Sequence, residues 1–123
     1  MKTENLEQEE VEEKSIFVEY FGASPMIKVL DFLIEARDFD YSMTEIARNS
    51  EVGWSAFSVV FKKLLEKNII KQTRTIGNAK LYKLNTENPA VQKLIKLDEE
   101  LTKIETEKIA KTAKTQIGKK VAA

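Results

Sequence analysis

Apolar residues recur along the chain with two periods, one typical of helices and one typical of strands. Residues 1–14 carry six glutamates and almost no apolar side chain, so this acidic leader is expected to be a solvated helix or disordered. Residues 15–21 are apolar and β-prone and are followed by a glycine, which predicts a short strand or a first turn of packing. A compact domain is therefore expected to begin near residue 15.

Three helices are predicted between residues 24 and 67. Ser24 and Pro25 suit the start of a helix that ends near residue 37, because serine caps free N–H groups and proline has no N–H to leave unbonded. Residues 39–42 are short and expected to be extended. Ser42 and Glu45 have the spacing of a capping box, which begins a helix over about 43–49. The third helix, over about 54–67, has one apolar face formed by Phe57, Val60, Phe61 and Leu64.

A β-hairpin is predicted directly after the third helix. Two β-patterned runs, 69–76 and 79–84, are separated only by Gly77-Asn78, a dipeptide typical of two-residue hairpin turns. Because side chains alternate along a strand, Tyr82 and Leu84 are expected to share one face of the hairpin.

A long amphipathic helix is predicted over 88–113. Apolar residues recur in it at steps of three and four for about two heptads. This stripe consists of Leu94, Leu97, Leu101 and Ile104. A helix of roughly 25 residues runs about 37 Å, more than a small domain covers, so part of it is expected to pair with a second copy in a homodimer. The alternative is a helix packed only on its own domain. The basic tail over 114–123 is either an added DNA contact or a frayed end.

The order of elements is the plan of a winged helix-turn-helix. We predict a mainly α fold with a small β-hairpin, in which residues 15–87 form the winged helix-turn-helix domain and a long C-terminal dimerisation helix follows. Two helices that cross steeply need a small residue at their contact and apolar residues to close the wedge. These positions are held by Ile46, Ala47, Val52, Phe57 and Val60. Glu51 stands where such turns usually have glycine, and a positive φ there would cost about 1 kcal/mol.

Composition narrows the chemistry that the chain can perform. The 123 residues fit one domain, and the absence of cysteine and histidine excludes zinc fingers, thiol nucleophiles and histidine acid–base catalysis. The carboxylates of Asp31, Asp38 and Asp40 have no metal-ligand spacing, so we expect no enzymatic activity, no cofactor and no metal. No signal peptide or membrane-length apolar run is visible, and a cytoplasmic, nucleoid-associated protein is expected.

Charge is distributed unevenly, although the formal net charge is zero. Residues 54–83 hold seven lysines and arginines against one glutamate, and residues 108–123 hold five lysines and no acid. Local potential, rather than the sum over the chain, attracts phosphate groups. Double-stranded DNA is therefore the expected partner, with no membrane and no metal involved.

The paired helices and the hairpin end GNAKLYKLN carry a family resemblance. With them, residues 24–97 resemble the archaeal-type winged helix-turn-helix transcription regulators. The resemblance implies a DNA-binding fold, commonly dimeric, with the helix over 54–67 in the major groove and the hairpin wing against the backbone or minor groove. The predicted function is a homodimeric DNA-binding transcription regulator. The alternative is a winged-helix module for protein–protein assembly in a transcription or partition complex, without an operator of its own.

The residues expected to meet DNA lie on the helix face opposite the apolar stripe and on the hairpin. They are Trp54, Ser55, Ser58, Val59, Lys62, Lys63, Arg74, Asn78 and Lys80. Serines and lysines suit phosphates, and Val59 suits a thymine methyl. The helix face has no arginine or asparagine, which predicts modest or shape-based specificity. In the alternative interpretation Trp54 lies at the core edge, and the charged side chains only keep the surface and the hairpin soluble.

Overall fold

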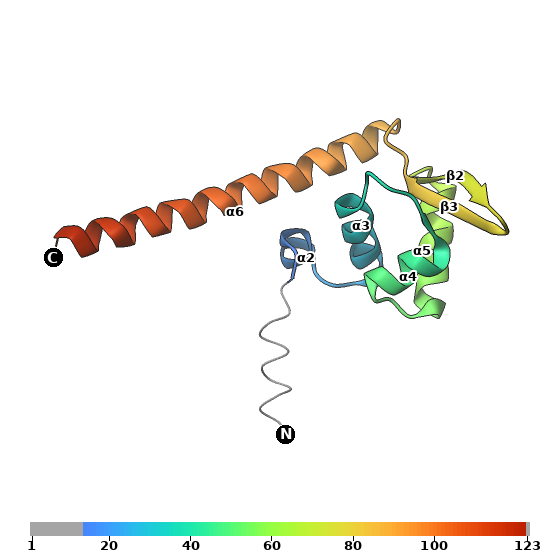
Figure 1. The fold of residues 1–123 in the computed structure, drawn as a ribbon, viewed down its shortest axis with the longest axis horizontal. Coiled ribbons are helices and arrows are strands. Elements are labelled where there is room, and N and C mark those ends of the chain that lie inside the picture. The colour runs from blue at the N-terminus through green and yellow to red at the C-terminus, as the bar shows by residue number, and fades with distance from the viewer. Residues whose placement is uncertain (1–13, 123) are drawn as a thin grey trace, which may run out of the picture.

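The computed structural model describes the backbone of residues 14–122 and the side chains of residues 14–113. The predicted acidic leader, apart from Lys14, and the side chains of the basic tail over 114–123 lie outside the described residues. The three predicted helices, the hairpin and the long C-terminal helix follow one another in the predicted order (Figure 1). They are α2 (Ile16–Phe21), α3 (Pro25–Glu35), β1 (Tyr41–Ser42), α4 (Met43–Ser50), α5 (Trp54–Glu66), β2 (Ile70–Ile76), β3 (Ala79–Leu84) and α6 (Pro89–Ala122).

Serine side chains begin the first helices. The Ser15 hydroxyl accepts a hydrogen bond from the Val18 N–H at 3.1 Å, so residues 16–21 form a helix and the strand interpretation of this segment was wrong. Ser24 caps α3 in the same way. The capping box predicted from Ser42 and Glu45 is confirmed, since each side chain accepts a hydrogen bond from the other residue's backbone N–H.

The hairpin belongs to a three-stranded antiparallel sheet in which β3 lies between β1 and β2. The Gly77-Asn78 turn is confirmed, and Gly77 has a φ of 61°, a conformation that glycine adopts without strain. The short β1 lies in the segment expected to be extended, and it pairs Tyr41 with Tyr82. This pairing was not predicted, because a strand of two residues is too short to indicate its partner. The register between β2 and β3 shifts between Gln72 and Arg74.

The hydrophobic core lies between α3, α4, α5 and one face of the sheet. Phe57, Ile46 and Leu84 are each 0% exposed, and Tyr82 shares the face of Leu84 within the same core cluster, as predicted. The helix-turn-helix pattern is confirmed in these contacts, because its remaining apolar positions are buried or pack against the same cluster. They are Ala47, Val60 and Val52.

Glu51 occupies the turn between α4 and α5 with φ 58° and ψ 44°, which is the left-handed conformation. A residue with a Cβ is strained there by about 1 kcal/mol or more. The Lys28 ammonium donates a hydrogen bond to the Glu51 carbonyl oxygen at 3.0 Å, and this bond ties α3 to the turn. The helix-turn-helix is thus built with glutamate in place of glycine.

Helix α6 is longer than predicted. It has 34 residues and continues to Ala122 rather than ending near residue 113, since no proline interrupts residues 114–122. At 1.5 Å per residue it runs about 50 Å, and in Figure 1 it extends well past the other helices. None of the helices in the described residues is long and apolar enough to cross a membrane.

Candidate nucleic-acid interface

Helix α5 presents one face that its own domain leaves open. Phe57, Val60, Phe61 and Leu64 bury the other face in the core, as predicted. On the open face Val59 is 71% exposed, and Ser55 lies on the surface. Lys62 and Lys63 are exposed one turn further along the helix. The predicted reading face of α5 therefore forms a continuous solvent-facing surface.

Two residues of this face have contacts that the sequence left open. Trp54 is 54% exposed, yet its ring lies 5.5 Å from the ring of Phe57, so it stands at the core edge and faces solvent at once. Ser58 is half-buried, and its hydroxyl donates a hydrogen bond to the Ser55 carbonyl oxygen at 3.0 Å. A contact of Ser58 with DNA would have to use its oxygen lone pairs or break this bond.

The wing formed by β2 and β3 projects from the helices (Figure 1). Asn78 in the turn and Lys80 beside it are both exposed, and Lys80 pairs with Thr75 across the strands. Ile76, at the end of β2, is 55% exposed and was missed. The sequence could have indicated it, because Ile76 directly precedes the Gly77-Asn78 turn and must therefore lie at the tip of the wing.

Arg74 lies on β2 and forms an ion pair with Asp40, a contact that the sequence did not predict. Its Nε and Nη2 donate hydrogen bonds to Oδ2 and Oδ1 of Asp40, at 2.9 and 3.1 Å. The Arg74 guanidinium, followed by the hydroxyl of Thr73, lowers the pKa of the Asp40 carboxyl from 3.8 to about 2. Sequence reasoning considered Asp40 only as a catalytic carboxylate, because residues 34 positions apart share no local pattern.

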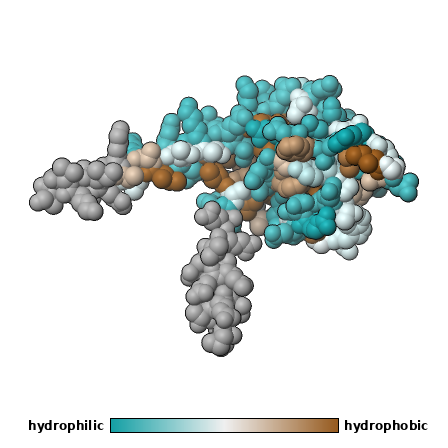
Figure 2. All heavy atoms as spheres, in the orientation of Figure 1, coloured by the Kyte–Doolittle hydropathy of each residue, from teal (hydrophilic) through white to brown (hydrophobic). Residues whose placement is uncertain are grey.

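The predicted dimerisation stripe of α6 is divided by the fold. Leu94 packs against the core, and Leu101 is 8% exposed. Leu97 and Ile104 remain 41% and 37% exposed, and Ile109, which was not predicted, is 70% exposed. Figure 2 shows apolar surface on the described part of α6 beyond the compact domain. Two of the four stripe residues thus face solvent in a single copy.

Polar contacts fix α6 against α2 and the end of α3. The Tyr20 hydroxyl donates to Oε2 of Glu105 at 2.8 Å, and Arg37 forms an ion pair with Glu99 at 3.3 Å. The Tyr20 hydrogen bond, followed by that of Lys108, lowers the pKa of the Glu105 carboxyl. The exposed apolar residues of α6 therefore stand on a helix whose direction is set by its own domain.

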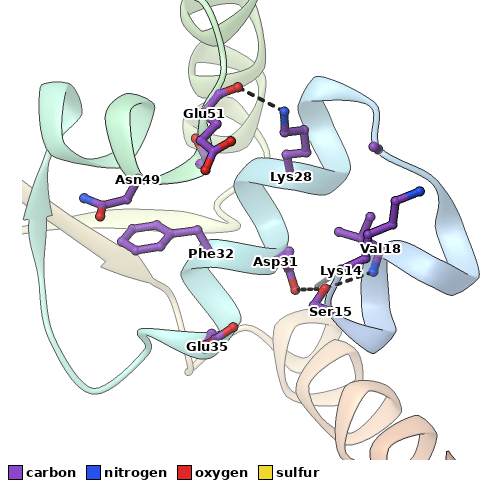
Figure 3. Close-up of a pocket in the computed structure, with 11 residues that line it drawn as sticks. Lys14, Ser15, Val18, Lys28, Asp31, Phe32, Glu35, Asn49 and Glu51 are labelled. Atoms are coloured by element: carbon purple, nitrogen blue, oxygen red, sulfur yellow. Dashed lines mark hydrogen bonds between the residues drawn. The ribbon is translucent and has the colours of Figure 1, made fainter. Parts of the chain in front are cut away.

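A cavity of about 560 Å³ lies between α2, α3 and the C-terminal end of α4 (Figure 3). Two hydrogen bonds join residues that line it. Lys28 donates to the Glu51 carbonyl oxygen, and the Ser15 hydroxyl donates to Oδ1 of Asp31 at 2.8 Å. Acidic and basic side chains both line it, together with the ring of Phe32. No local sequence pattern indicated this cavity, since its lining residues come from separate elements.

Within the described residues, no three Asp or Glu side chains lie together as metal ligands would. Asp31 accepts a hydrogen bond from Ser15, and Asp40 accepts hydrogen bonds from Arg74 and Thr73. These carboxylates therefore stabilise contacts between elements in this structure.

Comparison with known proteins supports the fold. No protein-family model matches the sequence, and no curated protein matches it. Among solved structures, a mutant of ZitR from Lactococcus lactis in apo form is 19% identical and matches 86% of this chain and 85% of that chain, with a TM-score of 0.58. Wild-type ZitR in complex with DNA is 18% identical over 69% of this chain and 60% of that chain, with a TM-score of 0.50.

At these identities the likeness shows the fold, and the predicted mainly α winged helix with a small β-hairpin and a long C-terminal helix is confirmed. Neither finding supports the narrower resemblance to archaeal-type regulators.

Proposed function

We propose that this chain is a DNA-binding transcription regulator, with α5 as the reading helix and the β2–β3 wing beside it. The observation that carries the proposal is the open face of α5, where Lys62 and Lys63 follow exposed Ser55 and Val59 on one solvent-facing surface. Helices enter the major groove of B-DNA by such a face, and lysines at its edge meet phosphates. A structural neighbour of the same fold, wild-type ZitR, has been solved in complex with DNA, which supports the same use here.

Sequence specificity is proposed to be modest. Helix α5 contains no arginine or asparagine, the side chains best suited to bidentate contacts with guanine and adenine. Phosphate contacts and the shape of the duplex then supply most of the binding energy. Binding to a random duplex should accordingly be readily measurable and strongly dependent on salt.

The test is fluorescence anisotropy with a labelled duplex between 50 and 200 mM salt. The double variant Lys62→Ala, Lys63→Ala removes two phosphate contacts, so the slope of log affinity against log salt should fall by about 2. The matched control, Lys96→Ala with Lys103→Ala, removes the same charge from exposed positions of α6 and should leave the slope unchanged. Equal slopes in both double variants would refute α5 as the reader, and a wild-type slope near zero would refute DNA binding.

Protein–protein assembly is the second candidate function. It is favoured by the exposed apolar side chains of Trp54 and Val59 on α5, which suit an aromatic anchor in a protein interface. Under this alternative, DNA affinity is weak and insensitive to the lysines of α5. The same salt titration therefore separates the two functions.

We further propose that the chain acts as a homodimer through α6. Leu97, Ile104 and Ile109 leave apolar surface exposed on a helix that is anchored to its own domain. Burying such residues against a second copy stabilises the pair by about 25 cal/mol for each Å² removed from water. A dimer would also place two reading helices on one duplex, as winged-helix and helix-turn-helix dimers do.

Analytical ultracentrifugation tests the dimer. Leu97→Gln with Ile104→Gln should shift the sedimenting species toward the monomer, while Thr102→Gln with Lys103→Gln, at exposed polar positions of the same helix, should not. Leu101 is unsuitable for this test because it is buried in its own copy. A dimer that persists in the first variant would refute α6 as the interface.

A further inference from the structure

The ion pair between Asp40 and Arg74 joins two parts of the sheet that are not neighbours. Asp40 directly precedes β1, Arg74 lies on β2, and β3 runs between these two strands. The side chain of Asp40 is 14% exposed and that of Arg74 is 61% exposed. The carboxylate is therefore largely covered, while the guanidinium above it remains open to solvent.

The geometry of the pair is side-on. Nε and Nη2 of Arg74 donate to the two carboxylate oxygens, and the Thr73 hydroxyl donates to Oδ2 of Asp40 at 2.5 Å. A guanidinium has five N–H donors, and this arrangement uses two of them. The three that remain, including both on Nη1, have no acceptor among the described residues. They lie away from Asp40, along the free edges of the guanidinium.

The register of the sheet explains how the guanidinium is held. Arg74 pairs with Leu81 of β3, and Leu81 pairs on its other side with Ser42 of β1. Leu81 is 8% exposed although it is not part of the main core cluster, whereas Tyr82 next to it is. Residues directly opposite each other on paired strands share a face of the sheet. Arg74 and Leu81 thus lie on the face away from the core, where Asp40 limits the movement of a long side chain.

We infer that Asp40 is a positioning residue for DNA binding, which holds the Arg74 guanidinium on the wing with its free edge turned toward a phosphate group. Arg74 is the only arginine in residues 54–84, so it is the one side chain of α5 and the wing with the planar, bidentate fit to phosphate. A guanidinium already fixed by a carboxylate loses less rotamer freedom when a phosphate binds. The inference rests on the proposed function and adds to it a residue that makes no DNA contact itself.

Substitution of each partner tests the inference by fluorescence anisotropy on a labelled duplex. Arg74→Gln should weaken binding by about twofold to fivefold, the range of one exposed ion pair, and lower the salt slope by about 1. Asp40→Asn keeps the size of the side chain and should cause a similar loss and a similar change of slope. The variant with both substitutions should bind no more weakly than Arg74→Gln alone, because Asp40 acts through Arg74.

The control is Asp38→Asn, which removes the same charge two residues earlier, from an exposed carboxylate of the same loop. Loss of a negative charge near DNA by itself strengthens binding, so this variant should bind as well as wild type or slightly better. An Asp40→Asn variant that also binds as well as wild type, or better, would overturn the inference. Wild-type protein without salt-dependent binding would instead overturn the proposed function.

An NMR measurement separates positioning from general stability. The Arg74 Nε–H signal, assigned by its loss in Arg74→Gln, should be protected from solvent exchange in wild type and in Asp38→Asn. In Asp40→Asn it should exchange rapidly, while the urea midpoint shows that the domain is still folded. A protected Arg74 signal in Asp40→Asn would refute the positioning role even if DNA affinity had fallen.

Discussion

Replacing Glu51 with glycine should stabilise the protein. Glu51 has a left-handed backbone conformation with φ 58° and ψ 44°, and its exposed side chain takes part in no hydrogen bond or ion pair among the described residues. The contact from Lys28 goes to the Glu51 carbonyl oxygen, which glycine retains. The substitution therefore relieves backbone strain and removes no favourable side-chain contact.

Three contributions set the size of the effect, and one of them opposes the other two. The left-handed conformation costs a residue with a Cβ about 1–2 kcal/mol. Glycine reduces this gain by about 0.4–1 kcal/mol, because it gives the unfolded chain more conformational freedom to lose on folding. Removal of a negative charge from the C-terminal end of α4 adds about 0.3 kcal/mol. The net expectation is a stabilisation of about 0.3–2 kcal/mol, centred near 1 kcal/mol, or a rise in Tm of roughly 1–8 °C.

Urea denaturation followed by circular dichroism and by the fluorescence of Trp54, the single tryptophan, measures this difference. The midpoint should rise with an unchanged m-value. Glu51→Gln separates the charge from the strain, and it should give only the smaller gain. Asn68→Gly is the matched control, because Asn68 also has a positive φ of 60° but asparagine tolerates it. A midpoint that falls in Glu51→Gly, or rises no further than in Asn68→Gly, would contradict the strain argument.

Two further measurements test the core and the ion pair of the sheet. Phe57→Ala removes a ring that is 0% exposed and lies 5.4 Å from the ring of Phe61. Urea unfolding should show that the free energy of unfolding falls by about 3–5 kcal/mol. A fall below about 1.5 kcal/mol would mean that neighbouring side chains fill the space left by the ring. The pKa of Asp40 is about 2 in the folded chain and close to 4 when unfolded. Its ion pair therefore stabilises the fold above about pH 4 and is lost as the pH falls toward 2. The difference in urea midpoint between wild type and Asp40→Asn should shrink over that interval, and a constant difference would contradict the lowered pKa.

Local rules predicted most of the fold. The capping box at Ser42 and the Gly77-Asn78 turn are set by residues within four positions of each other, and both are confirmed. The sequence left open whether the turn at Glu51 is built differently or tolerates the strain, and the structure shows the left-handed conformation. Residues 15–21 were ambiguous because their β-prone side chains compete with the helix cap of Ser15, and the cap with tertiary packing decided for a helix.

The contacts that depend on the assembled fold could not be predicted in this way. Arg74 meets Asp40 only because β1 joins the hairpin as a third strand, and a strand of two residues has no periodicity to detect. The apolar stripe of α6 was predicted correctly, but its spacing does not indicate which of its residues are buried against the rest of the domain. Leu101 is buried while Leu97 is not, since α6 crosses its own domain at an angle that the sequence does not encode locally.

Because charge is distributed unevenly along the chain, the position of Arg74, the only arginine of α5 and the wing, matters for binding. Under the proposed function, the net charge of zero adds no attraction to DNA beyond that of the local basic surface, so affinity depends on where each cation stands relative to the phosphates. The lysines of α5 are compact charges on long flexible chains, and each loses rotamer freedom when it binds. Arg74 has lost much of that freedom already through its two hydrogen bonds to Asp40. Under the proposed function, a largely covered acid next to β1 therefore strengthens binding to a polyanion, although its own charge opposes that binding.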